Sequence, residues 1–343
     1  MLRLYDESWL FWALANTVVI MIVCRLIAMY QSEYMTFYYK KDGSLMSEFM
    51  EKSGITKMRY TPYLFALHAH LQGFCFLPYS LAQEGWESLR MEFERELFKL
   101  EDGQDIALEW AQGKPKAGDN RPILMCVGGL GGGNQVGYVK SVIKTAEKKG
   151  FKCVYVLFRG AGGLPLTTGK IYSLLSVGDI KEPTDYIHKT YCKDTGKNMY
   201  LYACSLGAAM STHYLLENAE TTPIKGAAFY GTPLCTGKSG KFFQEFCFGL
   251  YDTALGVDVN MKIRAHLPQI RKYSTDAQNK SYERGLYQES WRLSDIDNYV
   301  IAPMFGHKDK QDYWNKGTIA GNLHKLTKVP CFYLHANDDI VID

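Results

Sequence analysis

A serine at the junction between an apolar run and a helix-forming run is the sharpest chemical signal in the chain. The segment reads NMYLYACSLGAAMSTHYLLENA (198–219), with Ser205 directly after the apolar run. A strand, a strained serine turn and a helix form a nucleophile elbow, which exposes the hydroxyl for attack on a carbonyl carbon. The helix amino terminus behind Ser205 favours a developing negative charge. We therefore predict that Ser205 is a nucleophile.

The match to the usual G-x-S-x-G pattern is incomplete. Gly207 is present, but Ala203 stands where the first glycine is expected, which adds one methyl group to the turn. A serine in an ordinary strand-to-helix turn has the same local sequence. The alternative of a non-catalytic serine therefore stays open at this point.

A glycine-rich segment, GGLGGGN (128–134), follows the apolar run Ile123–Val127. Such a loop can hold a phosphate, or its backbone N–H groups can stabilise an oxyanion. The nucleotide alternative needs an acidic residue about 20 residues further on, or a G-K-[ST] ending. Neither pattern is met, because the next apolar run ends in Arg159-Gly160. The oxyanion interpretation is favoured.

An acidic pair, Asp338-Asp339, follows the late apolar run CFYLHA (331–336). In hydrolases with a nucleophile elbow, the acid that orients the catalytic histidine follows the serine in the chain, after a late strand. Two adjacent acids on a loop are also common as solvated residues. Both interpretations stay open from the residues alone.

The elements that would position these residues alternate between short apolar runs and helical segments. Such βαβ alternation predicts an α/β fold with a mostly parallel central sheet and helices on both faces. A hairpin around the turn 101–104 precedes it. The predicted strands are Glu94–Leu100, Ile106–Trp110, Ile123–Val127, Cys153–Phe158, Met199–Ala203, Ala227–Tyr230 and Cys331–Leu334; two of the predicted helices are Tyr138–Lys149 and Leu206–Asn218.

The chain divides into four predicted regions. They are an N-terminal tail (1–8), a transmembrane anchor helix (9–30), a polar and aromatic extension (31–92) and an α/β domain (93–343). Within the last region, residues 235 to about 297 break the strand–helix rhythm with amphipathic pieces. This segment is predicted to be a cap inserted over the carboxyl edge of the sheet.

The anchor is predicted from the uncharged run WLFWALANTVVIMIVC (9–24), which Arg25 and LIAMY extend to bilayer-spanning length. Arg25 can extend its charge to the headgroups. The rivals are a signal peptide, which lacks its cleavage pattern here, and a buried core helix. Lys and Arg counts favour a cytosolic α/β domain, but the compartment stays undetermined, and the prediction is a single-pass membrane protein.

Composition narrows the function classes. The formal charge is +3, and no basic block occurs, so no nucleic-acid partner is predicted. The nine cysteines are scattered without a C-x-x-C pair, so we predict reduced, structural thiols and no metal.

From about residue 60 to the end, the chain resembles the membrane-anchored α/β-hydrolase family 4, which includes acylglycerol lipases, phospholipases and esterases. The most specific match is FRGAGGLPLTTGKIY (158–172), because R-G-x-G-G-x-P-L-T-T is not a general hydrolase feature. Further matches are HAHLQ (68–72), GGLGGGNQVGYV (128–139), PMFGHKDKQDYW (303–314) and VPCFYLHANDD (329–339).

The resemblance implies an α/β-hydrolase fold and a carboxylic ester hydrolase that acts on lipid esters at a membrane without a cofactor. Ser205 would be the nucleophile, and the backbone N–H groups of Leu130 and Leu206 would form the oxyanion hole. Asp339 would be the acid, with Asp338 as the alternative.

The chain departs from the family's pattern at the catalytic histidine. The family's H-G-G-H-type segment lies some 25 to 30 residues after the acid, and this chain reaches Asp343, so we expect the domain to lack its C-terminal end and the catalytic histidine. His188 and His213 are predicted within helices and His335 within a strand. Hence the alternative function is a catalytically inactive membrane subunit or scaffold with protein partners. A third option takes the base from His307 or His324.

Overall fold

The computed structural model describes residues 3–62, 67–72, 91–131, 137–289 and 291–342. The chain forms two compact units, Met1–Tyr79 and Ser80–Asp343, which are described separately.

The first unit begins with the helix α1 (Arg3–Tyr30). Its stretch Trp9–Tyr30 has a mean hydropathy of 2.2 over its most apolar window and is not buried within the chain. By length and composition it could cross a membrane, although a signal sequence passes the same test. The helix begins at Arg3, within the predicted N-terminal tail (1–8), and its candidate membrane span is Trp9–Tyr30. Residues 3–8 contain no glycine or proline that would end a helix there.

The remainder of the first unit is short of regular structure. The strands β1 (Glu33–Tyr34) and β2 (Arg59–Tyr60) pair antiparallel, and α2 (Leu45–Lys52) and η1 (Ile55–Lys57) lie between them in the chain. The Ser44 side chain accepts a hydrogen bond from the Ser47 N–H and so caps α2. The HAHLQ match (68–72) lies in this unit, and residues 63–66 and 73–90 of the predicted extension lie outside the described part.

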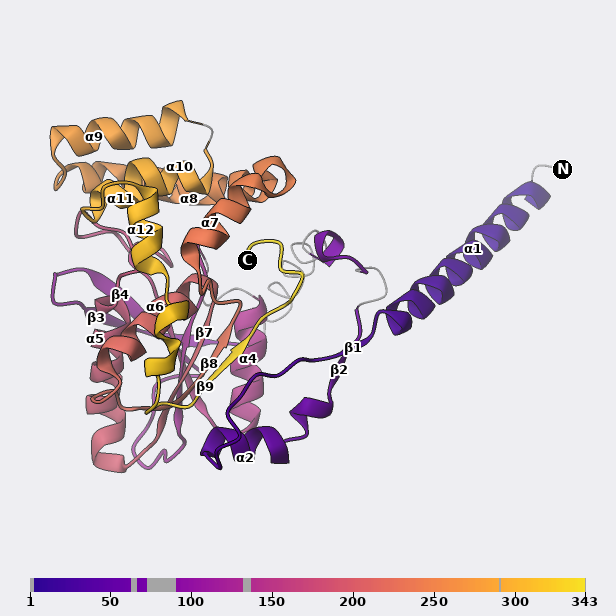
Figure 1. The fold of residues 1–343 in the computed structure, drawn as a ribbon, viewed down its shortest axis with the longest axis horizontal. Helices are drawn as coiled ribbons and strands as arrows, with labels where there is room; N and C mark the ends of the chain where they lie inside the picture. Colours follow the sequence, from indigo (N-terminus) through magenta and orange to yellow (C-terminus); the bar gives the residue numbers. More distant parts are fainter. Residues whose placement is uncertain (1–2, 63–66, 73–90, 132–136, 290, 343) are drawn as a thin grey trace. The chain divides into compact units, whose positions relative to one another are not determined.

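The second unit is built on a seven-stranded sheet in the order β3-β4-β6-β5-β7-β8-β9 (Figure 1). The hairpin β3–β4 is antiparallel, β4 pairs antiparallel with β6, and all later pairs are parallel. The strands are β3 (Phe93–Lys99), β4 (Asp105–Ala111), β5 (Ile123–Val127), β6 (Lys152–Leu157), β7 (Met199–Cys204), β8 (Ile224–Tyr230) and β9 (Cys331–Leu334). The predicted mostly parallel sheet and its hairpin are confirmed.

One strand boundary changes the interpretation of a histidine. Strand β9 ends at Leu334, so His335 lies after the strand and not within it as predicted. The pairing explains the end, because Leu334 is the last residue of β9 in register with β8, opposite Tyr230.

Helices cover both faces of the sheet, as alternation along β5 demonstrates. Met125 and Val127 pack in a core with residues of α5 (Gly178–Ile187) and α6 (Ser205–Asn218). Cys126, between them, packs in a second core with α4 (Gly137–Lys148). Because successive strand side chains point to opposite faces, α4 lies on one face and α5 and α6 lie on the other.

A helical insert follows β8 and precedes β9. It contains α7 (Thr236–Glu245), η4 (Phe246–Gly249), α8 (Leu250–Arg271), α9 (Asp276–Glu283), η5 (Arg284–Gln288), α10 (Leu293–Ile296), η6 (Asp297–Ile301), α11 (Ala302–Met304), α12 (Lys310–Gly317) and η7 (Ala320–Lys325). In Figure 1 the orange helices α8, α9 and α10 gather at one end of the sheet. This helical insert extends beyond residue 297, the approximate end of the predicted cap. Buried side chains of α12, including Trp314, share one core with those of α8 and join the two parts.

Candidate active site

Ser205 lies at the junction of β7 and α6 in a strained backbone conformation. Its φ is 51°, in the left-handed region, whereas Cys204 before it is extended with φ −132° and ψ 151°. For a residue other than glycine this conformation costs about 1–3 kcal/mol and persists only where the surroundings impose it. Ser205 is also the first residue of α6, so the positive end of the helix lies behind its side chain.

Close packing of the elements imposes this turn. A Cβ atom on Gly207 would overlap the Gly128 carbonyl oxygen and lie 2.8 Å from Val127 Cγ1. A Cβ atom on Gly129 would lie 3.1 Å from Ser205 Cβ. The start of α6 therefore packs directly on the chain that leaves β5, and only glycine fits at residue 207. Ala203, in contrast, is fully buried with its extra methyl group.

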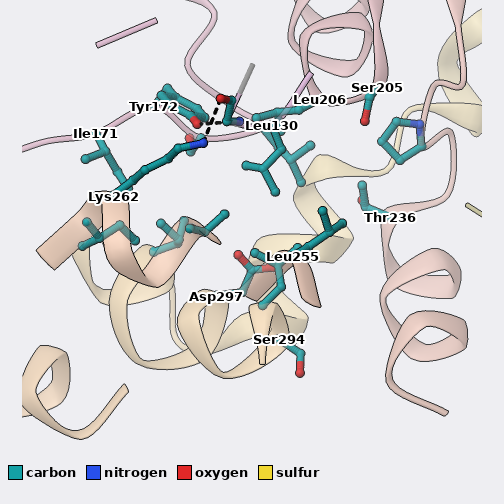
Figure 2. A pocket seen from close by; sticks show the side chains of 18 of the residues that line it. Leu130, Ile171, Tyr172, Ser205, Leu206, Thr236, Leu255, Lys262, Ser294 and Asp297 are labelled. Carbon is teal, nitrogen blue, oxygen red and sulfur yellow. Dashed lines mark hydrogen bonds between the residues drawn. The ribbon is translucent and has the colours of Figure 1, made fainter. Parts of the chain in front are cut away.

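The Ser205 hydroxyl lines a cavity of about 470 Å³ between the carboxyl edge of the sheet and the helical insert. Figure 2 shows Ser205 with Leu130 and Leu206 on one side, while Leu255 and Asp297 come from the insert. Apolar side chains of α7 and α8, such as Phe243 and Val259, form much of the wall. Among the residues described, Ser205 Oγ has no hydrogen-bond partner.

The glycine-rich loop is held from two sides where it passes the cavity. The Gly131 N–H donates to Tyr172 Oη at 3.1 Å, and Lys262 Nζ of α8 donates to the Gly131 carbonyl oxygen at 2.9 Å (Figure 2). Lys262 also pairs with Asp258 at 2.6 Å. A Cβ atom on Gly131 would lie 2.5 Å from Lys262 Nζ, so the ion pair packs tightly on this residue. Residues 132–136 lie outside the described part.

Both predicted oxyanion-hole residues, Leu130 and Leu206, line the same cavity as Ser205. Leu206 is the second residue of α6, where a helical N–H has no partner within the helix. Two segments of the chain, one with Leu130 and one with Leu206, therefore border the cavity that contains the serine. Backbone N–H donors can stabilise the oxyanion of a tetrahedral intermediate.

The acidic pair lies beside the cavity but not in its lining. Asp339 Oδ1 accepts the N–H groups of Val341 at 2.8 Å and Ile342 at 3.0 Å, and these two side chains do line the cavity. Asp338 is exposed, whereas Asp339 is half-buried. The carboxylate of Asp339 therefore forms a local turn that carries the chain past the cavity.

The histidines differ in their relation to the cavity. His266 of α8 lines it, and its Nε2 lies 3.0 Å from the Gly160 carbonyl oxygen. His307 pairs with Asp312 at 3.5 Å, and His324 is exposed on η7. His213 lies in α6 as predicted, hydrogen-bonded to the Gly317 carbonyl oxygen, and burial lowers its pKa. His266 has no sequence signal of its own, because its place in the cavity wall depends on the insert.

Two further charged groups, Arg159 and Asp297, line the cavity. Arg159, in the FRGAGG match, forms a bidentate ion pair with buried Asp179 at 2.6 and 2.7 Å and also pairs with Asp102. Asp297 accepts a hydrogen bond from Trp314 Nε1 at 2.8 Å, and burial raises the pKa of its carboxyl to about 7. Asp297 has no sequence signal of its own, and only its position in the lining identifies it.

Comparisons with known proteins agree with the architecture. No family model matches the chain. It is 26% identical over 245 residues to an abhydrolase domain-containing protein of Dictyostelium discoideum (69% of this chain, 58% of the relative). It is 26% identical over 235 residues to a monoacylglycerol lipase of Saccharomyces cerevisiae (67% and 50%). It is 24% identical over 258 residues to the mouse phospholipase ABHD3 (73% and 59%).

A structural comparison matches an esterase of Pyrococcus furiosus with a TM-score of 0.41 and 13% identity, covering 74% of this chain and 88% of that one. The chain spans half to three fifths of the length of the three curated relatives. The chain is thus similar in sequence to abhydrolase domain-containing proteins, and its mostly parallel seven-stranded sheet with flanking helices has the α/β-hydrolase fold.

Proposed function

We propose that this protein is a membrane-anchored serine hydrolase that cleaves carboxylic esters of lipids, either acylglycerols or phospholipids. The observation that carries the proposal is the left-handed Ser205 at the start of α6, with its hydroxyl in an apolar cavity. A strained serine at this junction is the position of the nucleophile in hydrolases with a nucleophile elbow.

In the proposed mechanism, Ser205 Oγ attacks the ester carbonyl carbon and transfers its proton to a histidine base. The N–H groups of Leu130 and Leu206 donate to the tetrahedral oxyanion. The intermediate then collapses to an acyl-enzyme, the alcohol leaves with the proton, and water hydrolyses the acyl group by the same steps. The double restraint on Gly131, from Tyr172 and Lys262, supports a preorganised donor at Leu130.

Different observations support the assignment of the acid and the assignment of the base in this mechanism. Asp339 is proposed as the acid, because it follows a late strand and its turn lies beside the cavity lining. For the base, His266 is the described histidine that shares the cavity with Ser205. Its Nε2 faces a carbonyl oxygen, so Nδ1 is the nitrogen that would accept a proton. The resemblance instead implies a histidine after the acid, and the experiment below separates the two assignments.

The lipid substrate class is supported by the cavity and the relatives together. An apolar cavity of about 470 Å³ suits an acyl chain. The matched yeast relative is named a monoacylglycerol lipase, and the mouse relative a phospholipase. The apolar helix Trp9–Tyr30 supports a position beside lipid.

A fluorophosphonate probe tests the proposal, since it reacts with activated serines. The 343-residue chain and the longest product of its reading frame are both purified in detergent, and the labelled residue is identified by mass spectrometry. We expect labelling at Ser205 that Ser205→Ala abolishes. Loss of labelling in His266→Ala assigns the base to His266, whereas labelling confined to the longer product assigns it to a later histidine. No labelling of either folded product contradicts the proposal.

The alternative function is a catalytically inactive, hydrolase-like membrane subunit or scaffold. It is favoured by Ala203 and Ala208, which replace elbow glycines of the resembled family, and by a Ser205 hydroxyl that no described residue hydrogen-bonds. For this function we expect no probe labelling in either product, and co-purification of a protein partner that survives Ser205→Ala.

A further inference from the structure

The end of the insert between α7 and α8 presents apolar side chains to solvent. We call residues Phe246–Leu250 the aromatic tip. Within it, Phe248 is 97% exposed and Leu250 is 52% exposed. Adjacent large apolar side chains at a surface mark interaction sites more often than single ones do.

The backbone of the aromatic tip is strained at two residues other than glycine. Cys247 and Phe248 both adopt the left-handed conformation, with φ of 47° and 58°, and Gly249 continues it at 75°. Such a conformation is sterically unfavourable for residues other than glycine and persists where it serves a local requirement. Because Phe248 is almost fully exposed, its own burial does not offset this cost.

Contacts beneath the tip hold it in place. The Phe242 and Phe246 rings stack with centroids 4.6 Å apart, and Phe246 stacks on Tyr251 at 6.1 Å. Arg292 Nη2 donates to the Phe248 carbonyl oxygen at 3.3 Å. Phe248 is therefore carried outward on a supported aromatic base.

Helix α7, which leads into the aromatic tip, carries exposed basic side chains. Lys238 and Lys241 are exposed, and neither forms an ion pair with any residue of the described ranges. Glu245 is the exposed acid of the same helix. Exposed lysines next to apolar side chains match a bilayer surface, where anionic headgroups lie above the acyl boundary.

The aromatic tip connects the two helices that form the cavity wall. Phe243 of α7 and Leu255 of α8 both line the cavity that contains Ser205, and Leu255 is labelled in Figure 2. A surface that binds the tip would thus lie against α7 and α8, the helices that form the wall of the cavity.

We propose that the aromatic tip inserts into the surface of a lipid bilayer that contains anionic lipid, with Phe248 and Leu250 at the acyl boundary and Lys238 and Lys241 at the headgroups. If the inserted tip also gives lipid esters a route into the cavity, that role rests on the proposed function. The insertion itself does not depend on catalysis, and it is a membrane contact separate from the helix Trp9–Tyr30.

Insertion depth is measured on the full chain reconstituted in vesicles of phosphatidylcholine and phosphatidylserine. Phe248→Trp adds a probe at the tip, and Leu97→Trp adds a matched probe on the edge strand β3, where Leu97 is 62% exposed. The emission of the six native tryptophans is subtracted using the unmodified chain. We expect lipids brominated in the acyl chain to quench the added emission at 248 and not at 97. Equal quenching at both positions, or none at 248, overturns the proposal.

A second copy of the chain is the competing occupant of the tip. In that case the probe at 248 would be shielded in detergent as protein concentration rises and would stay unquenched by brominated lipid in vesicles. This outcome also overturns the proposal.

A hydrolysis assay then connects the tip to substrate entry. The double variant Phe248→Ser, Leu250→Ser is compared with Leu97→Ser on a lipid ester in vesicles and on a soluble short-chain ester in detergent. We expect a loss of roughly tenfold for the double variant on vesicles alone, since the variant weakens apolar contact with the interface. An equal loss on both esters contradicts the proposed role. If the unmodified chain hydrolyses neither ester, the proposed function fails, while the quenching result still decides the insertion.

Discussion

At the scale of single residues, the geometry of the site depends on a position where only glycine fits. Gly207 brings the start of α6 against the carbonyl of Gly128, and Ser205 is left with a backbone angle that its side chain disfavours. The strain and the contact have one cause, which is the direct packing of the helix on the chain after β5. A substitution at residue 207 should therefore disturb the serine turn more than it disturbs the rest of the sheet.

Gly207→Ala is expected to destabilise the second unit by about 1–3 kcal/mol, the usual cost of adding a methyl group to a packed site. The new Cβ would overlap a backbone oxygen, which cannot move without shifting the loop. Denaturant unfolding followed by the second unit's signal measures the change. The matched control is Gly321→Ala, where a Cβ atom meets nothing within 4 Å. An unchanged unfolding free energy for Gly207→Ala would contradict this packing argument.

Asp297 is a second residue whose behaviour is set by its surroundings. Burial disfavours the charged form and raises the carboxyl pKa from 3.8 to about 7, while the hydrogen bond from Trp314 acts in the opposite direction. Between these two pH values the folded protein binds a proton that the unfolded chain has released. Stability from this group is therefore present at low pH and is lost as pH rises.

Comparison with Asp297→Asn isolates this effect. We expect the unfolding free energy of the unmodified chain to fall relative to that of the variant between about pH 4 and pH 7, by roughly 2–4 kcal/mol in total. Urea unfolding at a series of pH values measures the difference. A difference that stays constant, or that grows in favour of the unmodified chain with rising pH, would show that the carboxyl titrates normally.

At the scale of elements, ion pairs join segments that are distant in the chain. Arg159 after β6 pairs with Asp179 at the start of α5 and with Asp102 in the turn between β3 and β4. The first partner is buried and its pair is bidentate, so the guanidinium fixes both position and orientation. This network holds the loop that lines the cavity near His266 and Tyr172.

Arg159→Met is expected to destabilise the second unit by about 3–5 kcal/mol, because it leaves the Asp179 carboxyl buried without its partner. The control is Lys181→Met, which removes an exposed pair with Asp185 on α5 and should cost less than about 1 kcal/mol. Thermal unfolding with denaturant titration compares the two. Equal effects would mean that the Arg159 pair is no more important than a surface pair.

A second link between elements runs from α8 to the glycine-rich loop through Lys262. If Ser205 is the nucleophile, Lys262→Met should slow fluorophosphonate labelling roughly tenfold, since a displaced oxyanion donor weakens stabilisation of the transition state. Lys262→Arg keeps the donor and should retain most of the rate. The neighbouring exposed Met261→Ala is the control for α8. Unaltered labelling in Lys262→Met, or equal loss in all three variants, would dismiss Lys262 as a positioning residue.

At the scale of the whole molecule, an apolar helix and an α/β-hydrolase domain occur in one chain as two compact units. A lipid hydrolase needs its cavity near a bilayer, and a helical stretch of 22 mostly apolar residues is of spanning length. The helix and the aromatic tip would supply two separate membrane contacts. The first of these can be tested without any assumption about catalysis.

We expect the chain to stay with membranes after alkaline carbonate extraction, and intact-mass analysis to find residues 1–30 still attached. Replacing Val19 and Ile20 by Lys, near the middle of the apolar helix, should release it, since charges at the bilayer centre are costly. The same double substitution at the exposed positions Leu97 and Met261 is the control. Removal of residues 1–30 by processing would instead identify the helix as a signal sequence.

Much of the fold could be predicted from local patterns in the sequence. Buried parallel strands are short apolar runs, and the predicted and observed bounds of Ile123–Val127 and Cys331–Leu334 coincide. The serine between strand and helix was found for the same reason, since its flanking residues must be small. The ends of strands that are set by pairing with a neighbouring strand were harder to predict from the sequence. His335 continues an apolar run but lies beyond the last paired residue of β9.

The sequence by itself determined which residue types follow each strand, and hence the sheet, the serine turn and the glycine-rich loop, because these depend on neighbours in the chain. Tertiary structure alone decided the cavity and its helical wall. His266, Lys262 and Asp297 acquire their positions from contacts with residues more than a dozen positions away, such as Gly160, Gly131 and Trp314. Their local sequences carry no sign of this, since the insert is held by packing and not by a repeated pattern.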